Sequence, residues 1–118
     1  MSESSRAKLF LILEKIGHIE TVVEEAGGIS PVLQDPITRR PAILMHLTAI
    51  AEQFHKLKQR QCSALDAFNA QDLKGMYDVR TYIAHDYEGV NLAIIEWIIR
   101  YGLPTLKTQC NTAIKEFS

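Results

Sequence analysis

The sequence predicts an all-α protein, an up-and-down bundle of four long helices with one short extra helix. Apolar residues recur at spacings of three and four over long stretches, and no stretch alternates apolar and polar residues as a half-buried strand would. Glycine and proline fall between these stretches, where helices end. The 118 residues, 47% of them hydrophobic and 23% charged, match one soluble domain, so we expect residues 1–118 to form a single helical domain.

The first two long helices each carry one apolar stripe. We expect the first over residues 4–26, capped by Ser4 or Ser5 and followed by two glycines. The second is expected over residues 36–59 after the capping residue Asp35, with Pro41 either kinking it or marking its true start. The two stripes are Leu9, Ile12, Ile16, Ile19, Val23 and Ala26, and Ile43, Leu47, Ile50, Phe54 and Leu57.

In the second half of the chain, we expect a polar linker over residues 60–70, with a short turn at 65–68. Three further helices are expected to follow it. The third helix spans residues 71–86 and is expected to turn Leu73, Met76, Arg80, Ile83 and Tyr87 to one inward face. The fourth, residues 91–101, is apolar nearly all round, so it is either central in the bundle or also buried against another subunit. Gly102 and Pro104 separate it from a last helix over residues 104–117, whose inward residues are Leu106, Cys110, Ile114 and Phe117.

Composition narrows the function classes. Thirteen basic and 14 acidic residues give a formal net charge of −1, so a nucleic-acid partner needs a local basic patch or one shared between subunits. Cys62 and Cys110 follow no secretory signal, which favours reduced thiols in a cytoplasmic protein. The apolar runs are too short to cross a bilayer, so we expect no membrane partner.

The histidines outside the third helix offer no metal site. His18, His46 and His55 are scattered, and none stands at a ligand spacing from a cysteine or a carboxylate. Phosphate-binding glycine loops and serine-nucleophile motifs are missing as well. We therefore expect neither a metal nor another cofactor.

The stretch DVRTYIAHDYEGV, residues 78–90, concentrates the candidate chemistry in Arg80, His85 and Tyr87. On a helix, Tyr87 lies about 20° around the axis from Arg80, so the two look the same way. His85 lies about 140° round and roughly 7 Å along from Arg80. Contact within one chain needs the long reach of arginine or a loosened helix end, and two chains meeting there would also bring the groups together.

This set of side chains suits phosphodiester cleavage without a metal. A histidine titrates near neutrality and can move a proton to or from a ribose 2′-hydroxyl or a leaving oxygen. An arginine is permanently charged and can hold a phosphate in two hydrogen bonds. Asp86 can orient the imidazole or cap the chain reversal, and Glu52 is either a partner of Arg80 or an exposed residue. A structural belt of polar residues remains the alternative to a site.

The pattern from Arg80 to Tyr87, R-x4-H-x-Y, resembles the signature of the HEPN superfamily and in particular of its HepT-like toxins. The following run, residues 78–107, is similar to that family's motif helix, break, apolar helix with tryptophan, and final helix. The stretch AILMHLTAIAEQFHKL, residues 42–57, resembles its second helix. Two positions depart: Thr81 stands where asparagine is common, and Ala51-Glu52-Gln53 keeps the glutamate of a Gly-Glu-Ala segment but not the glycine.

The resemblance implies a helical bundle that forms a homodimer, with two motifs facing one cleft. It implies a metal-independent endoribonuclease that acts on RNA, in which Arg80 and His85 are catalytic and Thr81, Asp86 and Glu52 support them. Such proteins are toxins of type VII-like toxin–antitoxin systems. The antitoxin is a minimal nucleotidyltransferase, which transfers AMP to the motif tyrosine, here Tyr87. The alternative is a non-catalytic HEPN module that binds a nucleotidyltransferase or a nucleotide.

Overall fold

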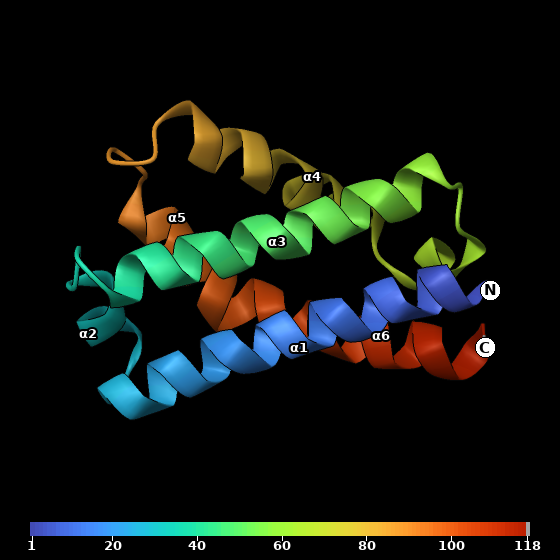
Figure 1. Ribbon diagram of the computed structural model, residues 1–118, viewed down its shortest axis with the longest axis horizontal. Helices are drawn as coiled ribbons and strands as arrows, with labels where there is room; N and C mark the ends of the chain where they lie inside the picture. The colour runs from blue at the N-terminus through green and yellow to red at the C-terminus, as the bar shows by residue number, and fades with distance from the viewer. Residues whose placement is uncertain (118) are drawn as a thin grey trace.

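The computed structural model describes residues 1–117, which form a bundle of helices with no strand in that range (Figure 1). Helices α1, α3 and α4 and the combined path of α5 to α6 are the long elements, and they run alternately up and down. Both termini consequently lie at the same end of the bundle. The predicted all-α fold class is confirmed. In order, the elements are α1 Glu3–Ala26, α2 Ile29–Leu33, α3 Arg39–Gln59, η1 Ser63–Ala67, α4 Ala70–His85, α5 Leu92–Trp97, η2 Ile98–Gly102 and α6 Leu103–Glu116.

Helix α1 ends where the sequence predicts and begins slightly earlier. The Ser2 hydroxyl caps it by accepting the N–H of Ser5 at 3.0 Å, two residues before the expected cap. At the other end Gly27 has a left-handed φ of 85°, which a residue without a Cβ adopts at little cost. The next N–H, from Gly28, bonds the carbonyl of Val23 at 3.0 Å and closes the helix end.

Helix α3 starts at Arg39, three residues later than the expected start at Pro36. The Asp35 carboxylate accepts backbone N–H groups of Ile37, Thr38 and Arg39 at 3.1 to 3.2 Å, so it does cap, but it caps a turn that precedes the helix. These hydrogen bonds lower the pKa of Asp35. Pro41 falls in the first helical turn, where a missing N–H costs no internal bond. Pro41 therefore marks the start of the helix and does not kink it.

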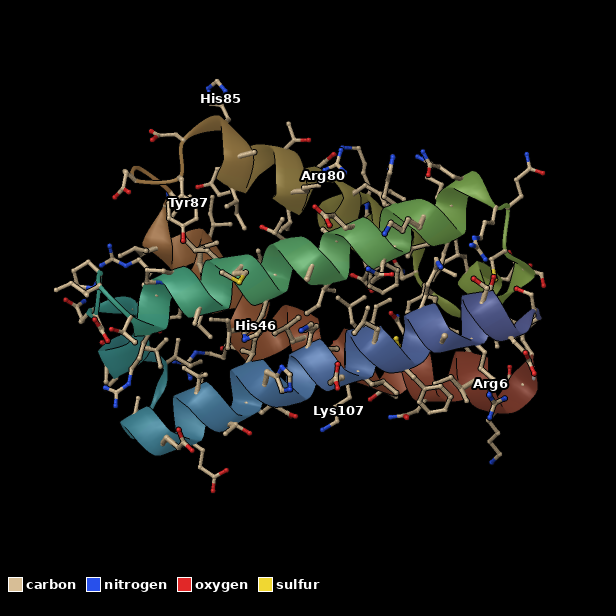
Figure 2. All side chains as sticks on the ribbon, viewed as in Figure 1. Arg6, His46, Arg80, His85, Tyr87 and Lys107 are labelled. Carbon is tan, nitrogen blue, oxygen red and sulfur yellow. The ribbon has the colours of Figure 1, made fainter. Side chains whose placement is uncertain are left out.

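Two histidines that the sequence places far apart meet between α1 and α3. The rings of His18 and His46 have centroids 5.2 Å apart, and His46 points from α3 toward α1 (Figure 2). Burial, with smaller effects from Lys15 and His18, lowers the pKa of His46. The prediction that these histidines are scattered is wrong for this pair, because the two helices pack side by side. Residues 1–117 nevertheless hold no group of three potential metal ligands.

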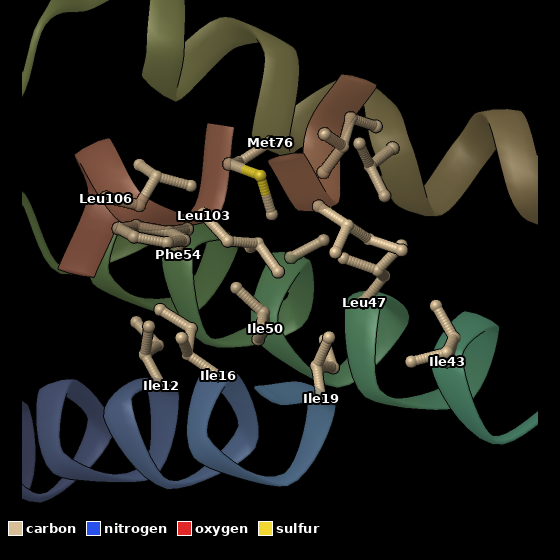
Figure 3. Packing of buried hydrophobic residues seen from close by; sticks show 14 of the residues in the cluster. Ile12, Ile16, Ile19, Ile43, Leu47, Ile50, Phe54, Met76, Leu103 and Leu106 are labelled. Carbon is tan, nitrogen blue, oxygen red and sulfur yellow. The ribbon is translucent and has the colours of Figure 1, made fainter. Parts of the chain in front are cut away.

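The core lies between α1, α3 and the later helices (Figure 3). The predicted stripes are confirmed: the α3 stripe is fully buried, and the α1 stripe is buried up to Ile19. Phe54 packs edge-on against Phe68 near η1, with ring centroids 5.2 Å apart. Cys110 is also buried here, which raises the pKa of its thiol to about 12. The core is therefore built by the inward stripes of α1 and α3 together with residues of the later helices.

The fourth and fifth predicted helices form one continuous path, which the sequence prediction divided wrongly at Gly102 and Pro104. A π-helical turn, η2, joins α5 to α6, and the Leu103 N–H bonds the carbonyl of Ile98 five residues back. A proline ring crowds the carbonyl four residues before it, and a wider turn just ahead of Pro104 relieves that clash. None of the helices in residues 1–117 is long and apolar enough to span a bilayer.

Candidate functional site

Arg80 does not lie on the inward face of α4, as the sequence stripe predicted. The buried residues of the helix are Met76, Val79 and Ile83, and Arg80 is exposed. Val79 takes the inward position because Met76, Val79 and Ile83 follow the spacing of three and four with an aliphatic residue at every step. Arg80 therefore projects from the flank of α4 that faces α3, where its charge stays in water.

The end of α4 is shaped by Asp86 and Tyr82. Helix α4 ends at His85, and the Asp86 carboxylate then accepts the N–H of Gly89 at 2.9 Å. A Cβ at Gly89 would overlap that carboxylate, so a larger residue there would have to displace Asp86 from this bond. The Tyr82 hydroxyl accepts the N–H of Asn91 at 2.7 Å and ties the far end of the loop to the helix. Asp86 thus takes the chain-reversal role, and the imidazole of His85 has no bond from it in this structure.

The three motif side chains point in different directions within one chain (Figure 2). His85 is exposed and projects away from the bundle, with the exposed Thr81 one turn before it on the same outer face. Tyr87 turns back toward α3, where its hydroxyl donates a long hydrogen bond of 3.4 Å to the Pro41 carbonyl. Among residues 1–117, Arg80 and His85 take part in none of the hydrogen bonds or ion pairs. One chain therefore does not bring Arg80 and His85 together.

A groove of about 430 Å³ runs between α3 and α4, and we call it the α3–α4 groove. The two helices are antiparallel: Tyr87 reaches Pro41 at one end, and Lys58 Nζ lies 4.5 Å from the centre of the Tyr77 ring at the other. Arg80 lies between these contacts, one turn before Ala84 of the groove wall. The groove is lined by Met45, Thr48, Ala49, Glu52, Ile83, Ala84 and Tyr87.

Glu52 is half-buried in the wall of this groove. The expected ion pair with Arg80 is not formed, and the ion pairs of residues 1–117 lie elsewhere, at Lys74–Asp78, Glu96–Arg100 and Glu20–Lys107. The alternative of an exposed Glu52 is also wrong, because the residue is half-buried and lines the groove between α3 and α4. Among residues 1–117, Glu52 forms no side-chain hydrogen bond or ion pair, so its carboxylate oxygens are left as acceptors for an outside partner.

A second groove of about 470 Å³ lies on the opposite flank of α4, against α5, η2 and α6. Asp78, Val79 and Tyr82 form its α4 wall, next to the helix face that carries His85. Three large side chains are exposed here: Ile94 by 45% and Trp97 by 59%, which both line the groove, and Tyr101 by 58%, whose ring contacts that of Trp97. We call these three residues the α5 apolar face. The sequence indicated this surface through the all-round apolarity of residues 91–101, but it did not indicate the groove.

Sequence reasoning also missed the small and flexible residues that shape the α3–α4 groove. Ala49 and Ala84 leave the space between the helices, and Met45 is 68% exposed at its rim. The one signal of this groove in the sequence is Met45, an apolar residue of α3 that lies outside the main stripe. Alanines give none, because they suit any helix position.

Comparison with known proteins agrees with the motif. A family model described as ribonuclease HepT-like matches residues 12–113, from α1 to α6, and the matched range includes Glu52, Arg80, His85 and Tyr87. No curated protein and no solved structure matches the chain.

Because Arg80 and His85 are exposed, we predict that they contribute little to the free energy of unfolding. Replacing either residue by alanine should change the free energy of unfolding by about 0.5 kcal/mol or less, because neither side chain is buried or paired within residues 1–117. Ile83→Ala on the same helix should cost about 2–5 kcal/mol, since Ile83 is 3% exposed. Urea unfolding followed by circular dichroism measures all three. A loss near 3 kcal/mol for Arg80→Ala would show that Arg80 is buried and paired after all.

Proposed function

We propose, since the chain belongs to the ribonuclease HepT-like family of the HEPN superfamily, that it is a metal-independent endoribonuclease with catalytic residues Arg80 and His85. The observation that carries this proposal is the state of these two side chains. Both are exposed, and both are free of hydrogen bonds and ion pairs within residues 1–117. A polar belt that stabilised the fold would instead be paired and buried, so the structural alternative has no support from the geometry.

The reaction that these groups support is attack of a ribose 2′-oxygen on the adjacent phosphorus. His85 takes the 2′-hydroxyl proton as the new O–P bond forms, and the bond to the 5′-oxygen breaks. The products are a 2′,3′-cyclic phosphate and a 5′-hydroxyl, whose proton comes from an imidazolium or from water. Arg80 binds the non-bridging oxygens and stabilises the charge that develops on them.

We place this site between two copies of the chain. Arg80 and His85 lie on faces of α4 that differ by about 140°, so one phosphate cannot meet both side chains of one chain easily. In a homodimer, Arg80 of one copy and His85 of the other can face the same cleft, and two such clefts follow from two-fold symmetry. Two arginines in one region also supply the local positive charge that a chain with a net charge of −1 lacks.

The α5 apolar face is the surface we propose for contact with the second copy. Ile94, Trp97 and Tyr101 are large and exposed, and the first two line the groove beside α4. Large exposed aromatic residues are typical of the centre of protein interfaces. The α4 wall of the same groove adjoins the face of His85, so contact there brings the partner close to the imidazole.

Tyr87 is the residue we propose for control of the activity. It is 41% exposed at the end of the α3–α4 groove, and among residues 1–117 its hydroxyl forms one hydrogen bond, the 3.4 Å bond to Pro41. A cognate minimal nucleotidyltransferase can reach this hydroxyl and transfer AMP to it, forming a Tyr–O–P bond and releasing pyrophosphate from ATP. The added phosphate carries negative charge to the flank of α4 that holds Arg80, and the nucleoside adds bulk there. Both effects oppose RNA binding.

The ribonuclease proposal predicts cleavage without divalent metal. Purified protein should cut RNA in EDTA, and Arg80→Ala and His85→Ala should each lower the rate by about 100-fold or more, as losses of a charge-stabilising or proton-transfer group do. Gel analysis of a labelled RNA follows the reaction, with Lys74→Ala on the exposed side of α4 as the control. Intact RNA with the wild-type protein would instead favour the non-catalytic HEPN module that binds a nucleotidyltransferase or a nucleotide.

The control proposal predicts a single modified residue. Co-expression with the nucleotidyltransferase encoded next to this chain should add the mass of AMP to the peptide that contains Tyr87. The Tyr87→Phe variant should lack that mass, because it has no hydroxyl to accept the group, while Tyr82→Phe should keep it. Mass spectrometry of the purified proteins distinguishes these cases, and an adduct that survives in Tyr87→Phe removes Tyr87 as the acceptor.

A further inference from the structure

The polar side-chain atoms that line the α3–α4 groove are hydrogen-bond acceptors. Thr48 donates its hydroxyl proton to the Leu44 carbonyl at 2.8 Å, and Tyr87 donates its own to Pro41. The oxygens of both hydroxyls are therefore left as acceptors, and the Glu52 carboxylate is an acceptor by nature. The remaining lining consists of apolar side chains. A ligand that fits this groove has flat apolar faces and an edge of hydrogen-bond donors.

The charge of Glu52 excludes a phosphate as the group that enters the groove. A carboxylate repels a phosphate, and no cation among residues 1–117 neutralises Glu52 by an ion pair. Arg80, on the same flank of α4 and outside the lining residues, is the group that suits a phosphate. A carboxylate on the α3 wall of the groove and an arginine one turn before Ala84 of its α4 wall thus match a nucleotide whose base enters the groove and whose phosphate lies at Arg80.

Among the four RNA bases, guanine matches an acceptor edge best. Its Watson–Crick edge presents two adjacent donors, the N1–H and the N2 amino group, which the two oxygens of a carboxylate can accept together. Adenine and cytosine each present one amino donor beside an acceptor nitrogen, and uracil presents one N–H between two carbonyls. An acceptor opposite Glu52 would be repelled, so each of these bases forms at most one favourable bond there.

The dimensions and the rim suit a base. A volume of about 430 Å³ falls within the range of about 300–1,000 Å³ that is usual for small-molecule sites. Met45 and Tyr87 stand at the groove, where a thioether and an aromatic ring can pack on the faces of an unstacked base. Ala49 and Ala84 leave the space between them open.

We propose that the α3–α4 groove is a base-binding subsite for a guanine of single-stranded RNA, with Glu52 as the residue that determines the specificity. This inference rests on the proposed ribonuclease function, because it assigns a substrate preference to the same site. It gives Glu52 a role in recognition, separate from the catalytic groups.

The test measures binding and not cleavage, so that it is independent of catalysis. The probes are four fluorescent pentaribonucleotides, each with a different central base in a uridine background, fully 2′-O-methylated so that no 2′-hydroxyl can attack. The wild-type protein should bind the guanine probe about 10-fold or more tightly than the adenine probe in fluorescence anisotropy, as a good bidentate base contact provides. In Glu52→Gln this ratio should fall to about 3-fold or less, because the amide presents one acceptor and one donor.

Two further variants complete the experiment. Glu14→Gln, an exposed carboxylate on α1 outside both grooves, should keep the wild-type preference. Ala84→Leu places a larger side chain in the groove from an exposed position and should abolish the preference without disturbing the core. Equal binding of all four probes, a preference for adenine, or an unchanged guanine preference in Glu52→Gln or Ala84→Leu overturns the inference. If the wild-type protein shows the preference but cuts no RNA, the subsite stands and the ribonuclease proposal fails.

Discussion

The buried stripe of α3 is the constraint on which the rest of the molecule depends. Its five apolar residues are fully buried, with α1 packed along one side and α4 along another. Burying a leucine, isoleucine or phenylalanine side chain contributes about 1.5–3 kcal/mol, so this stripe is a major source of the hydrophobic stabilisation. Helix α4 packs antiparallel along it, and the aliphatic residues Met76, Val79 and Ile83 of α4 turn inward, which leaves Arg80 exposed on the flank.

The site follows from that packing. The alanines between α3 and α4 keep the groove open, and the loop after His85 returns Tyr87 to its end. The loop itself is set by Asp86, Gly89 and Tyr82, which use side-chain bonds where the helix has stopped. Aliphatic packing thus positions Arg80, His85 and Tyr87 while their polar groups stay exposed to water.

Periodicity predicted most of the fold and only part of the site. The stripes of α1 and α3 could be predicted because the residues buried by packing are the same apolar residues that helical spacing places on one face. The spacing could not decide between Val79 and Arg80, since both fit a broad stripe, and only the preference of aliphatic side chains for the core settles it. The π-helical turn at Ile98–Gly102 could not be predicted, because Gly102 and Pro104 are equally typical of the end of a helix. The grooves and the meeting of His18 with His46 depend on tertiary packing, which no local pattern encodes.

The central claim is that one catalytic site is built from Arg80 of one chain and His85 of another. Differently tagged Arg80→Ala and His85→Ala chains, co-expressed and purified as mixed dimers, test it directly. Each parent dimer lacks one essential group in both sites, whereas the mixed dimer regains one intact site. We predict that it cuts RNA in EDTA at about half the wild-type rate. Mixed dimers as inactive as their parents would contradict the shared site.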